Sequence, residues 1–258
     1  MMAEKSKLGS FVQGSGNMSS FYSRGQEKQL VENLQAEIGE QYTHEVTMCD
    51  YFVRGKDHLG QKTINQYSIV KELGSGAFGV VYLVHVNETH EDLAMKVYSK
   101  QVLASKRDTM VKDETTGKLK PKNYLEEIKK EIEIMKRLNA TNVVRLKEVI
   151  DSENEDKLIL IIDFCAKGEI LAWDADQNRF SPCLADQEAF TEAQLRQFMR
   201  DLVEGLDHLH KSEICHRDIK PMNILLDQNN VCKIADFGSS DFFKAPGDDT
   251  FKDSVGTY

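Results

Sequence analysis

Two hydrophobic patterns alternate along this chain, and their order restricts the folds that are open to it. Three short runs rich in β-branched and aromatic residues predict strands separated by turns. These runs are Tyr67–Leu73, Val80–Val86 and Leu93–Tyr98. Apolar residues then recur every three or four positions from Leu125 to Leu138, which predicts a helix with one apolar face. Two more strand-like runs follow, Val143–Ile150 and Leu158–Ile162.

A second region begins near Thr191. Thr191 and Gln194 fit a capping box, in which two side chains satisfy free N–H groups at the start of a helix. The apolar stripe that follows consists of Leu195, Phe198, Met199, Leu202, Val203, Leu206 and Leu209. This stripe predicts a core helix. We therefore expect an α+β fold, with a β-rich first lobe, a helical second lobe and a linker near Asp163–Gly168.

The segments before and between these runs are polar. Residues 1–66 are expected to form a largely disordered N-terminal extension with a short helix at Gln26–Ile38, and residues 67–258 the folded domain. The lysine-rich stretch Ser99–Lys122 is interpreted as a solvated loop, with a basic docking surface as the alternative.

Composition excludes several classes of function. The 258 residues are 40% hydrophobic and 29% charged, and the net charge of −9 argues against a nucleic-acid partner. Five scattered cysteines favour reduced thiols inside the cell over a disulfide framework or a metal site. The longest apolar run, Leu158–Ile162, is too short to span a bilayer, and the N-terminus lacks a signal-peptide core. We expect a cytoplasmic protein without a membrane partner, with a nuclear location as the alternative.

The segment from Gly74 to Val81 matches the pattern G-x-G-x-x-G-x-V. Its glycines, Gly74, Gly76 and Gly79, let backbone N–H groups approach phosphate oxygens without obstruction by side chains. The G-x-G-x-x-G part also occurs in dinucleotide-binding turns, but there a helix follows directly. Here a strand-like run follows, so a hairpin that folds over a nucleotide fits better.

Lys96 lies between apolar residues of the third predicted strand. An unpaired buried ammonium is costly, so Lys96 needs an anionic partner there; a surface lysine on an edge strand is the alternative. Its position after the glycine pattern favours contact with phosphate. Glu131 lies beside the apolar face of the first helix and is the expected partner. Glu127 competes one turn earlier, and Glu133 is expected to face outward.

Two short strings carry the chemistry. They are His216-Arg217-Asp218-Ile219-Lys220-Pro221-Met222-Asn223 and Asp236-Phe237-Gly238. Asp218 is the candidate base or hydroxyl-positioning group, and Lys220 would neutralise a transferring phosphoryl group. Asn223 and Asp236 offer the oxygen ligands that Mg²⁺ prefers. His216 is expected to pack and hydrogen-bond under the catalytic loop.

In this order, the motifs resemble those of the eukaryotic protein kinases, from Tyr67 to Tyr258. The resemblance implies a bilobal protein-kinase fold, ATP and Mg²⁺ as cofactors, and transfer of the γ-phosphate to a protein hydroxyl. Lys220 is typical of serine/threonine kinases. The nucleotide-binding residues implied are Leu73, Gly74, Gly76, Gly79, Val81, Ala94, Lys96, Asp163 and Cys165.

A closer similarity is to the calcium/calmodulin-dependent protein kinase kinases. It is carried by Lys130–Leu138, Asn142–Leu146 and Asn154–Leu158. It implies Glu131 at the salt-bridge position, Ile162 at the back of the ATP pocket, and another kinase as a candidate protein substrate. Asp163 and Cys165 would contact adenine through their backbones. Three features depart from that family and leave the subfamily open. They are the lysine-rich insert, Ala140-Thr141 in place of His-Pro, and an extra loop at Trp173–Phe190.

The chain stops at Tyr258, inside the activation segment of that family. We therefore expect a truncated second lobe and a partly uncovered apolar stripe at residues 195–209. The tail needed to assess calmodulin binding is absent. Asp253 is a candidate acidic partner for Arg217, and Ser254 and Thr250 are candidate phosphosites.

Three charged residues distinguish a catalytic protein from a non-catalytic relative of the kinases. Lys96, Asp218 and Asp236 are all present, which favours a catalyst over a pseudokinase-like nucleotide-binding or scaffold protein. A third interpretation is a regulatory fragment that competes for kinase partners.

Overall fold

The computed structural model describes residues 45–76, 79–107, 109–112, 118–175, 178–183 and 189–243. The helix expected at Gln26–Ile38 lies outside these residues. Among the described helices, none combines the length and apolar character needed to cross a bilayer.

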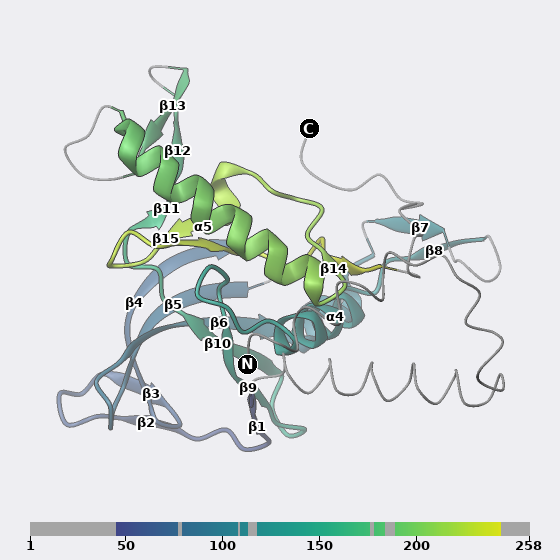
Figure 1. The fold of residues 1–258 in the computed structure, drawn as a ribbon. Coiled ribbons are helices and arrows are strands. Elements are labelled where there is room, and N and C mark those ends of the chain that lie inside the picture. Colours follow the sequence, from purple (N-terminus) through teal and green to yellow (C-terminus); the bar gives the residue numbers. More distant parts are fainter. Residues whose placement is uncertain are drawn as a thin grey trace, which may run out of the picture. The chain divides into compact units, whose positions relative to one another are not determined.

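An eight-stranded sheet forms the first lobe (Figure 1). In spatial order its strands are β1 (Thr47–Cys49), β9 (Leu146–Asp151), β10 (Lys157–Asp163), β6 (Asp92–Ser99), β5 (Gly79–Val86), β4 (Tyr67–Gly76), β3 (Lys62–Ile64) and β2 (Arg54–Lys56). Only the β1–β9 pair in this sheet is parallel. The five runs expected to be strands therefore lie together in the middle of the sheet.

The sheet curls, so that β4 and β9 approach each other although three strands lie between them. The Tyr67 hydroxyl of β4 donates a hydrogen bond to the Glu148 carboxylate of β9. Alternating side chains of β10 supply two cores: Ile159 and Ile161 face the inside of the curl, whereas Leu158 and Leu160 face the helices. This alternation explains why β10 is apolar along almost its whole length.

Residues 47–64 correct the expectation for the N-terminal extension. Here β1 pairs with β9, and the β2–β3 hairpin pairs with β4, so disorder is the wrong prediction for this part. Their sequences are short and polar, and their pairing depends on strands that are distant in sequence, which local patterns do not reveal.

Helix α4 (Tyr124–Lys136) packs against the sheet through Ile132 and Met135, as its spacing predicted. The stretch before α4 differs from the expected loop. It contains α3 (Lys100–Ser105), β7 (Met110–Lys112) and β8 (Leu119–Pro121). Ser99 caps α3 by accepting a hydrogen bond from Val102 N, and Leu103 is fully buried. A single apolar anchor is too weak a pattern to predict a helix of six residues.

The second lobe is built around α5 (Glu192–Lys211), which begins with the predicted capping box. Its stripe is divided: Phe198 and Leu209 are buried, whereas Leu195, Met199 and Val203 are 48%, 58% and 58% exposed. The expected partly uncovered apolar face is therefore present.

Short strands also belong to the second lobe (Figure 1). β11 (Gly168–Glu169), β15 (Ile224–Leu226) and β16 (Cys232–Ile234) form one small sheet, and β14 (Ile214–Cys215) pairs with β17 (Asp241–Phe242). The expected loop at Trp173–Phe190 is partly wrong, because β12 (Leu171–Asp174) and β13 (Arg179–Pro182) form a hairpin. An edge-on contact between Trp173 and Phe180 holds this hairpin across its strands.

Candidate active site

Two adjoining cavities lie where the sheet, α4 and the Asp236-Phe237-Gly238 string meet. The larger measures about 590 Å³ and the smaller about 370 Å³. Both are lined by Val81, Lys96, Glu131 and Asp236. These four residues therefore mark the shared wall of the site.

The glycine pattern forms the hairpin between β4 and β5. Gly76 pairs with Gly79, and β5 continues as a strand beside β6, which rules out the helix that a dinucleotide-binding turn requires. A Cβ atom placed on Gly74 or Gly76 would meet nothing within 4 Å, so these backbones leave space for a ligand. Ala77 and Phe78 lie outside the described residues.

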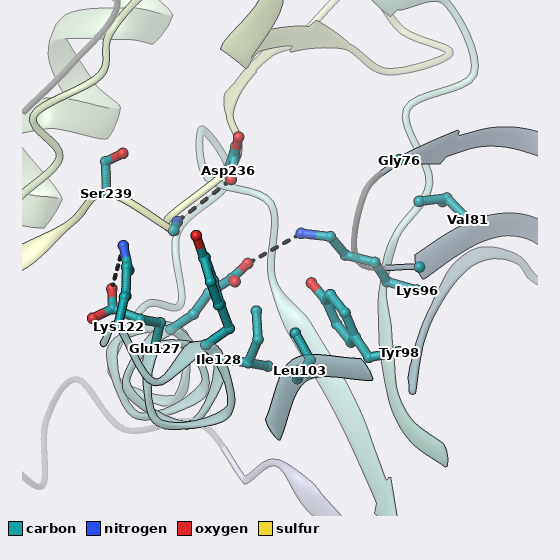
Figure 2. Close-up of a pocket in the computed structure, with 14 residues that line it drawn as sticks. Gly76, Val81, Lys96, Tyr98, Leu103, Lys122, Glu127, Ile128, Asp236 and Ser239 are labelled. Carbon is teal, nitrogen blue, oxygen red and sulfur yellow. Dashed lines mark hydrogen bonds and ion pairs between the residues drawn. The ribbon is translucent and has the colours of Figure 1, made fainter. Parts of the chain in front are cut away.

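Lys96 and Glu131 form the predicted ion pair, with 3.2 Å between Nζ and Oε1. Because β6 lies between β5 and β10, Lys96 is not on an edge strand. The competing Glu127 pairs instead with Lys122, as the dashed line in Figure 2 shows. Glu133 is 63% exposed and pairs with Lys136. The apolar face of α4 left Glu127 as a competitor, and Glu131, which the family resemblance favoured, is the glutamate that pairs with Lys96.

Tyr98 lies beside this ion pair (Figure 2). The Lys96 Nζ is 5.5 Å from the centre of the Tyr98 ring. Burial alone lowers the pKa of Lys96, but the neighbouring Glu131, Tyr98 and Asp236 raise it above its ordinary value. Burial raises the pKa of Tyr98 to about 12. At neutral pH the site thus holds an ammonium and an uncharged phenol.

Asp218 is held by two residues of its own string. Asn223 Nδ2 donates hydrogen bonds to the Asp218 carbonyl oxygen at 2.8 Å and to its Oδ2 at 3.0 Å. Lys220 Nζ lies 2.8 Å from the same Oδ2. Asn223 belongs to the short helix η2 (Pro221–Asn223), is 5% exposed and lines the larger cavity. Asn223 therefore links Asp218 to that cavity.

Asp236 reaches the cavities because the residue after it is anchored. Phe237 is 1% exposed and contacts the His216 ring edge-on, with 5.3 Å between ring centres. His216 is buried, and its Nε2 lies 3.0 Å from the Ala235 carbonyl oxygen, as its predicted packing position requires. Burial lowers the pKa of His216. Asp236 itself has a φ of 63°, a left-handed conformation that non-glycine residues rarely adopt.

The strand end at Asp163 is fixed by a cluster of positive charge. The Asp163 carboxylate lies 2.9 Å from Arg145 Nε and 3.5 Å from both Lys147 and Lys233. Burial opposes ionisation, but hydrogen bonding and charge from Arg145 and the two lysines lower the pKa of Asp163. Two residues later, Cys165 is buried and its carbonyl oxygen accepts a hydrogen bond from Gly168 N. The segment between the lobes is therefore fixed at Asp163 by ion pairs and at Cys165 by its hydrogen bond with Gly168.

Comparison with known proteins gives this arrangement a family. Residues 67–258 match the model of the protein kinase domain. The chain belongs to the protein kinase family. The matched segment contains every residue of the two cavities, and it begins at β4, the strand that leads into the glycine loop.

Several curated serine/threonine kinases are similar to this kinase domain. "Serine/threonine-protein kinase ssp1" of Schizosaccharomyces pombe is 40% identical over 70% of this chain and 25% of that protein. "Calcium/calmodulin-dependent protein kinase kinase" of Caenorhabditis elegans is 35% identical over 69% of this chain and 32% of that protein. "Serine/threonine-protein kinase GRIK2" of Arabidopsis thaliana is 33% identical over 80% of this chain and 45% of that protein. The chain thus spans between a quarter and a half of these relatives.

The kinase domain brings most of the predicted site residues together. The larger cavity is lined by Leu73, Val81, Ala94, Lys96, Glu131, Asp163, Cys165, Asn223 and Asp236, and also by Ile162. The smaller cavity adds Gly76 and Gly79. Gly74 pairs with Val81 in the β4–β5 ladder. Asp218 is linked to the cavity by Asn223, and Lys220 contacts Asp218.

Three features of the site were not predicted from the sequence. Tyr98 lies two residues after Lys96, and the period of a strand places both on one face, so this signal was available. Of the cations around Asp163, Arg145 immediately precedes β9, Lys147 lies in β9 and Lys233 lies in β16, and no local pattern joins them. Arg217 pairs with Asp241 at 3.3 Å, whereas Asp253, Ser254 and Thr250 lie outside the described residues.

The residues of the kinase domain fit ATP and Mg²⁺. The larger cavity has apolar walls at Val81, Ala94 and Leu225, which suit a purine. The Tyr98 hydroxyl is buried without a hydrogen-bond partner among the described residues, next to the Lys96 ammonium. Asn223 uses its Nδ2 to hold Asp218, and its amide oxygen and the Asp236 carboxylate are the oxygen donors that could hold Mg²⁺ at this cavity.

Proposed function

We propose that this chain carries the phosphoryl-transfer site of a serine/threonine protein kinase. The observation that supports the proposal most directly is a single cavity lined by Lys96, Asn223 and Asp236, with Asp218 hydrogen-bonded to Asn223 at its edge. A phosphate-contacting cation, two oxygen donors for magnesium and a candidate base are thus in one place.

Each residue contributes a separate step in this proposal. Lys96, held by Glu131, would orient the phosphates of ATP, and Asn223 and Asp236 would hold Mg²⁺. Bound Mg²⁺–ATP supplies the γ-phosphoryl group and the charge neutralisation around it. Asp218 positions the attacking hydroxyl and accepts its proton, and Lys220 balances the charge that develops on the phosphoryl oxygens. The backbones of Asp163 and Cys165 would contact the adenine edge.

We further propose that the protein substrate is another kinase. The proposal is supported by one relative whose name describes it as a calcium/calmodulin-dependent kinase kinase. A link of this chain to calcium and calmodulin belongs to the same proposal. A test is phosphate incorporation into a catalytically inactive kinase, with its activation-segment threonines replaced by alanine as the control substrate.

The proposed reaction is tested by measuring transfer of labelled γ-phosphate from Mg²⁺–ATP to a serine/threonine substrate. Asp218→Asn keeps the shape of the side chain and removes its charge, so we expect transfer to fall roughly 10²- to 10⁴-fold. The matched control is Asp207→Asn, an exposed ion-paired aspartate on α5. Equal rates in Asp218→Asn and the wild type would contradict the proposal.

The same measurement distinguishes the kinase from the alternative function, a nucleotide-binding scaffold that does not transfer phosphate. A wild-type chain that binds Mg²⁺–ATP and transfers no phosphate would support a nucleotide-binding scaffold. In that case Lys96→Met should weaken nucleotide binding, whereas Asp218→Asn should not.

A further inference from the structure

Asp241 holds two cations that come from different lobes. Its Oδ1 lies 2.7 Å from Lys130 Nζ on α4, and its Oδ2 lies 3.3 Å from the Arg217 guanidinium. Asp241 and Arg217 are 23% and 14% exposed, so this contact is partly shielded from solvent. The Asp241 carboxylate therefore links α4 to the His216–Asn223 segment, called the catalytic string below.

The two cations held by Asp241 are each adjacent in sequence to a residue of the candidate active site. Lys130 immediately precedes Glu131, which pairs with Lys96, and Arg217 immediately precedes Asp218. Holding Lys130 fixes the rotation and height of α4 at the level of Glu131. Holding Arg217 fixes the backbone that leads directly into Asp218.

Asp241 is itself firmly placed. It pairs with Cys215 in the β14–β17 ladder, one residue before the catalytic string begins. The next residue, Phe242, packs its ring under the Arg137 guanidinium at the end of α4, 4.4 Å from ring centre to guanidinium carbon. β17 thus contacts α4 at two points separated by about two turns of the helix.

Arg217 shows a second sign of constraint. Its φ is 65°, in the left-handed region that costs a non-glycine residue free energy. Such a conformation persists where the surroundings impose it. Here Arg217 Nε donates a hydrogen bond to the Ser239 carbonyl oxygen at 2.7 Å, and its guanidinium is held by Asp241.

We propose that Asp241 is a positioning residue that sets the Lys96–Glu131 pair and Asp218 in register with each other. The negative charge that joins α4 to Arg217 is thereby built into the chain and needs no phosphorylation. This inference rests on the proposed kinase function, and it assigns Asp241 no contact with substrate or nucleotide.

The test compares Asp241→Asn, Lys130→Gln and the double variant with the wild type. We expect each single variant to lower kcat for phosphoryl transfer roughly 10-fold, with KM for ATP changed less than about twofold, because misplacement of reacting groups affects the rate. The double variant should lose little more than Asp241→Asn alone, because Lys130→Gln breaks one of the two contacts that Asp241→Asn already breaks. Asp241→Glu should restore part of the rate.

Lys136→Gln is the matched control, since Lys136 is also an ion-paired lysine on α4 but pairs with Glu133 on the exposed side. It should leave kcat unchanged. An Asp241→Asn variant that folds and keeps the wild-type kcat would overturn the inference while leaving the kinase proposal intact. A raised kcat would also overturn it and would make Asp241 inhibitory. A wild-type chain without transfer would instead count against the proposed function.

Discussion

Glycines of one loop have two different structural roles. A Cβ atom on Gly79 would lie 2.0 Å from the Val97 carbonyl oxygen, because β5 and β6 meet there. A Cβ atom on Gly76 would meet nothing within 4 Å. Gly79 is therefore required by the sheet, whereas Gly76 leaves room for a ligand.

We expect Gly79→Ala to lower the free energy of unfolding by about 1–3 kcal/mol, because the β5–β6 backbones must separate. Gly76→Ala should change it by less than about 0.5 kcal/mol and should weaken Mg²⁺–ATP binding instead. Urea unfolding and nucleotide titration of both variants check this. Equal loss of stability in the two would contradict the distinction.

At the scale of single residues, the sequence predicted the groups that would take part in the reaction, but it did not predict the residue that we propose positions them. Lys96, Asp218, Asn223 and Asp236 carry charge or amide groups at fixed spacings. Helical periodicity set Glu133 apart, and the family resemblance favoured Glu131 over Glu127. Asp241 could not be found in the same way. Its contacts to Lys130 and Arg217 join three segments that only the fold brings together, and a lone aspartate near Phe242 gives no local pattern.

Among the elements, α5 contains a glycine that the helix itself does not need. A Cβ atom on Gly205 would lie 2.7 Å from the Asn142 carbonyl oxygen and 2.9 Å from Ile234 Cδ1. Asn142 cannot easily move, because its carbonyl oxygen also accepts a hydrogen bond from Ile234 N at 2.9 Å. Gly205 therefore allows α5 to approach the loop before β9.

Gly205→Ala should destabilise the fold by about 1–3 kcal/mol, although alanine is worth about 1 kcal/mol more than glycine in a helix. Glu204→Ala, at the exposed neighbouring position, should change stability by less than about 0.5 kcal/mol. Thermal or urea unfolding of both variants measures the difference. A stabilised Gly205→Ala variant would show that α5 can move away from Asn142.

The elements that could be predicted are those with their own periodicity. α4, α5 and the central strands each repeat an apolar pattern over several residues. The elements that were missed include α3 and the β7–β8 and β12–β13 hairpins, which are all short. Their stability comes from a cap at Ser99 or from cross-strand pairs, which act over too few residues to show a period.

For the whole molecule, acid stability depends on histidines that are uncharged in the folded state. Burial lowers the pKa of both His216 and His208 below their ordinary value of 6.5. Below that pH the unfolded chain therefore binds more protons than the native chain, and stability falls as pH decreases until the native pKa is passed. The free energy of unfolding should be lower at pH 5.5 than at pH 7.5. His208→Gln should reduce this slope, and a constant or rising stability would contradict the argument.

The start of the family match and the start of the folded sheet are different positions. The match begins at Tyr67, but β1 covers the outer side of β9, and β3 covers the outer side of β4. A chain cut at Tyr67 would expose two long strands whose free N–H and C=O groups can pair with other molecules. The edge strands that replace them, β1 and β2, have three residues each and offer little to pair with. The residues that protect this domain from aggregation thus precede the ones that define its family.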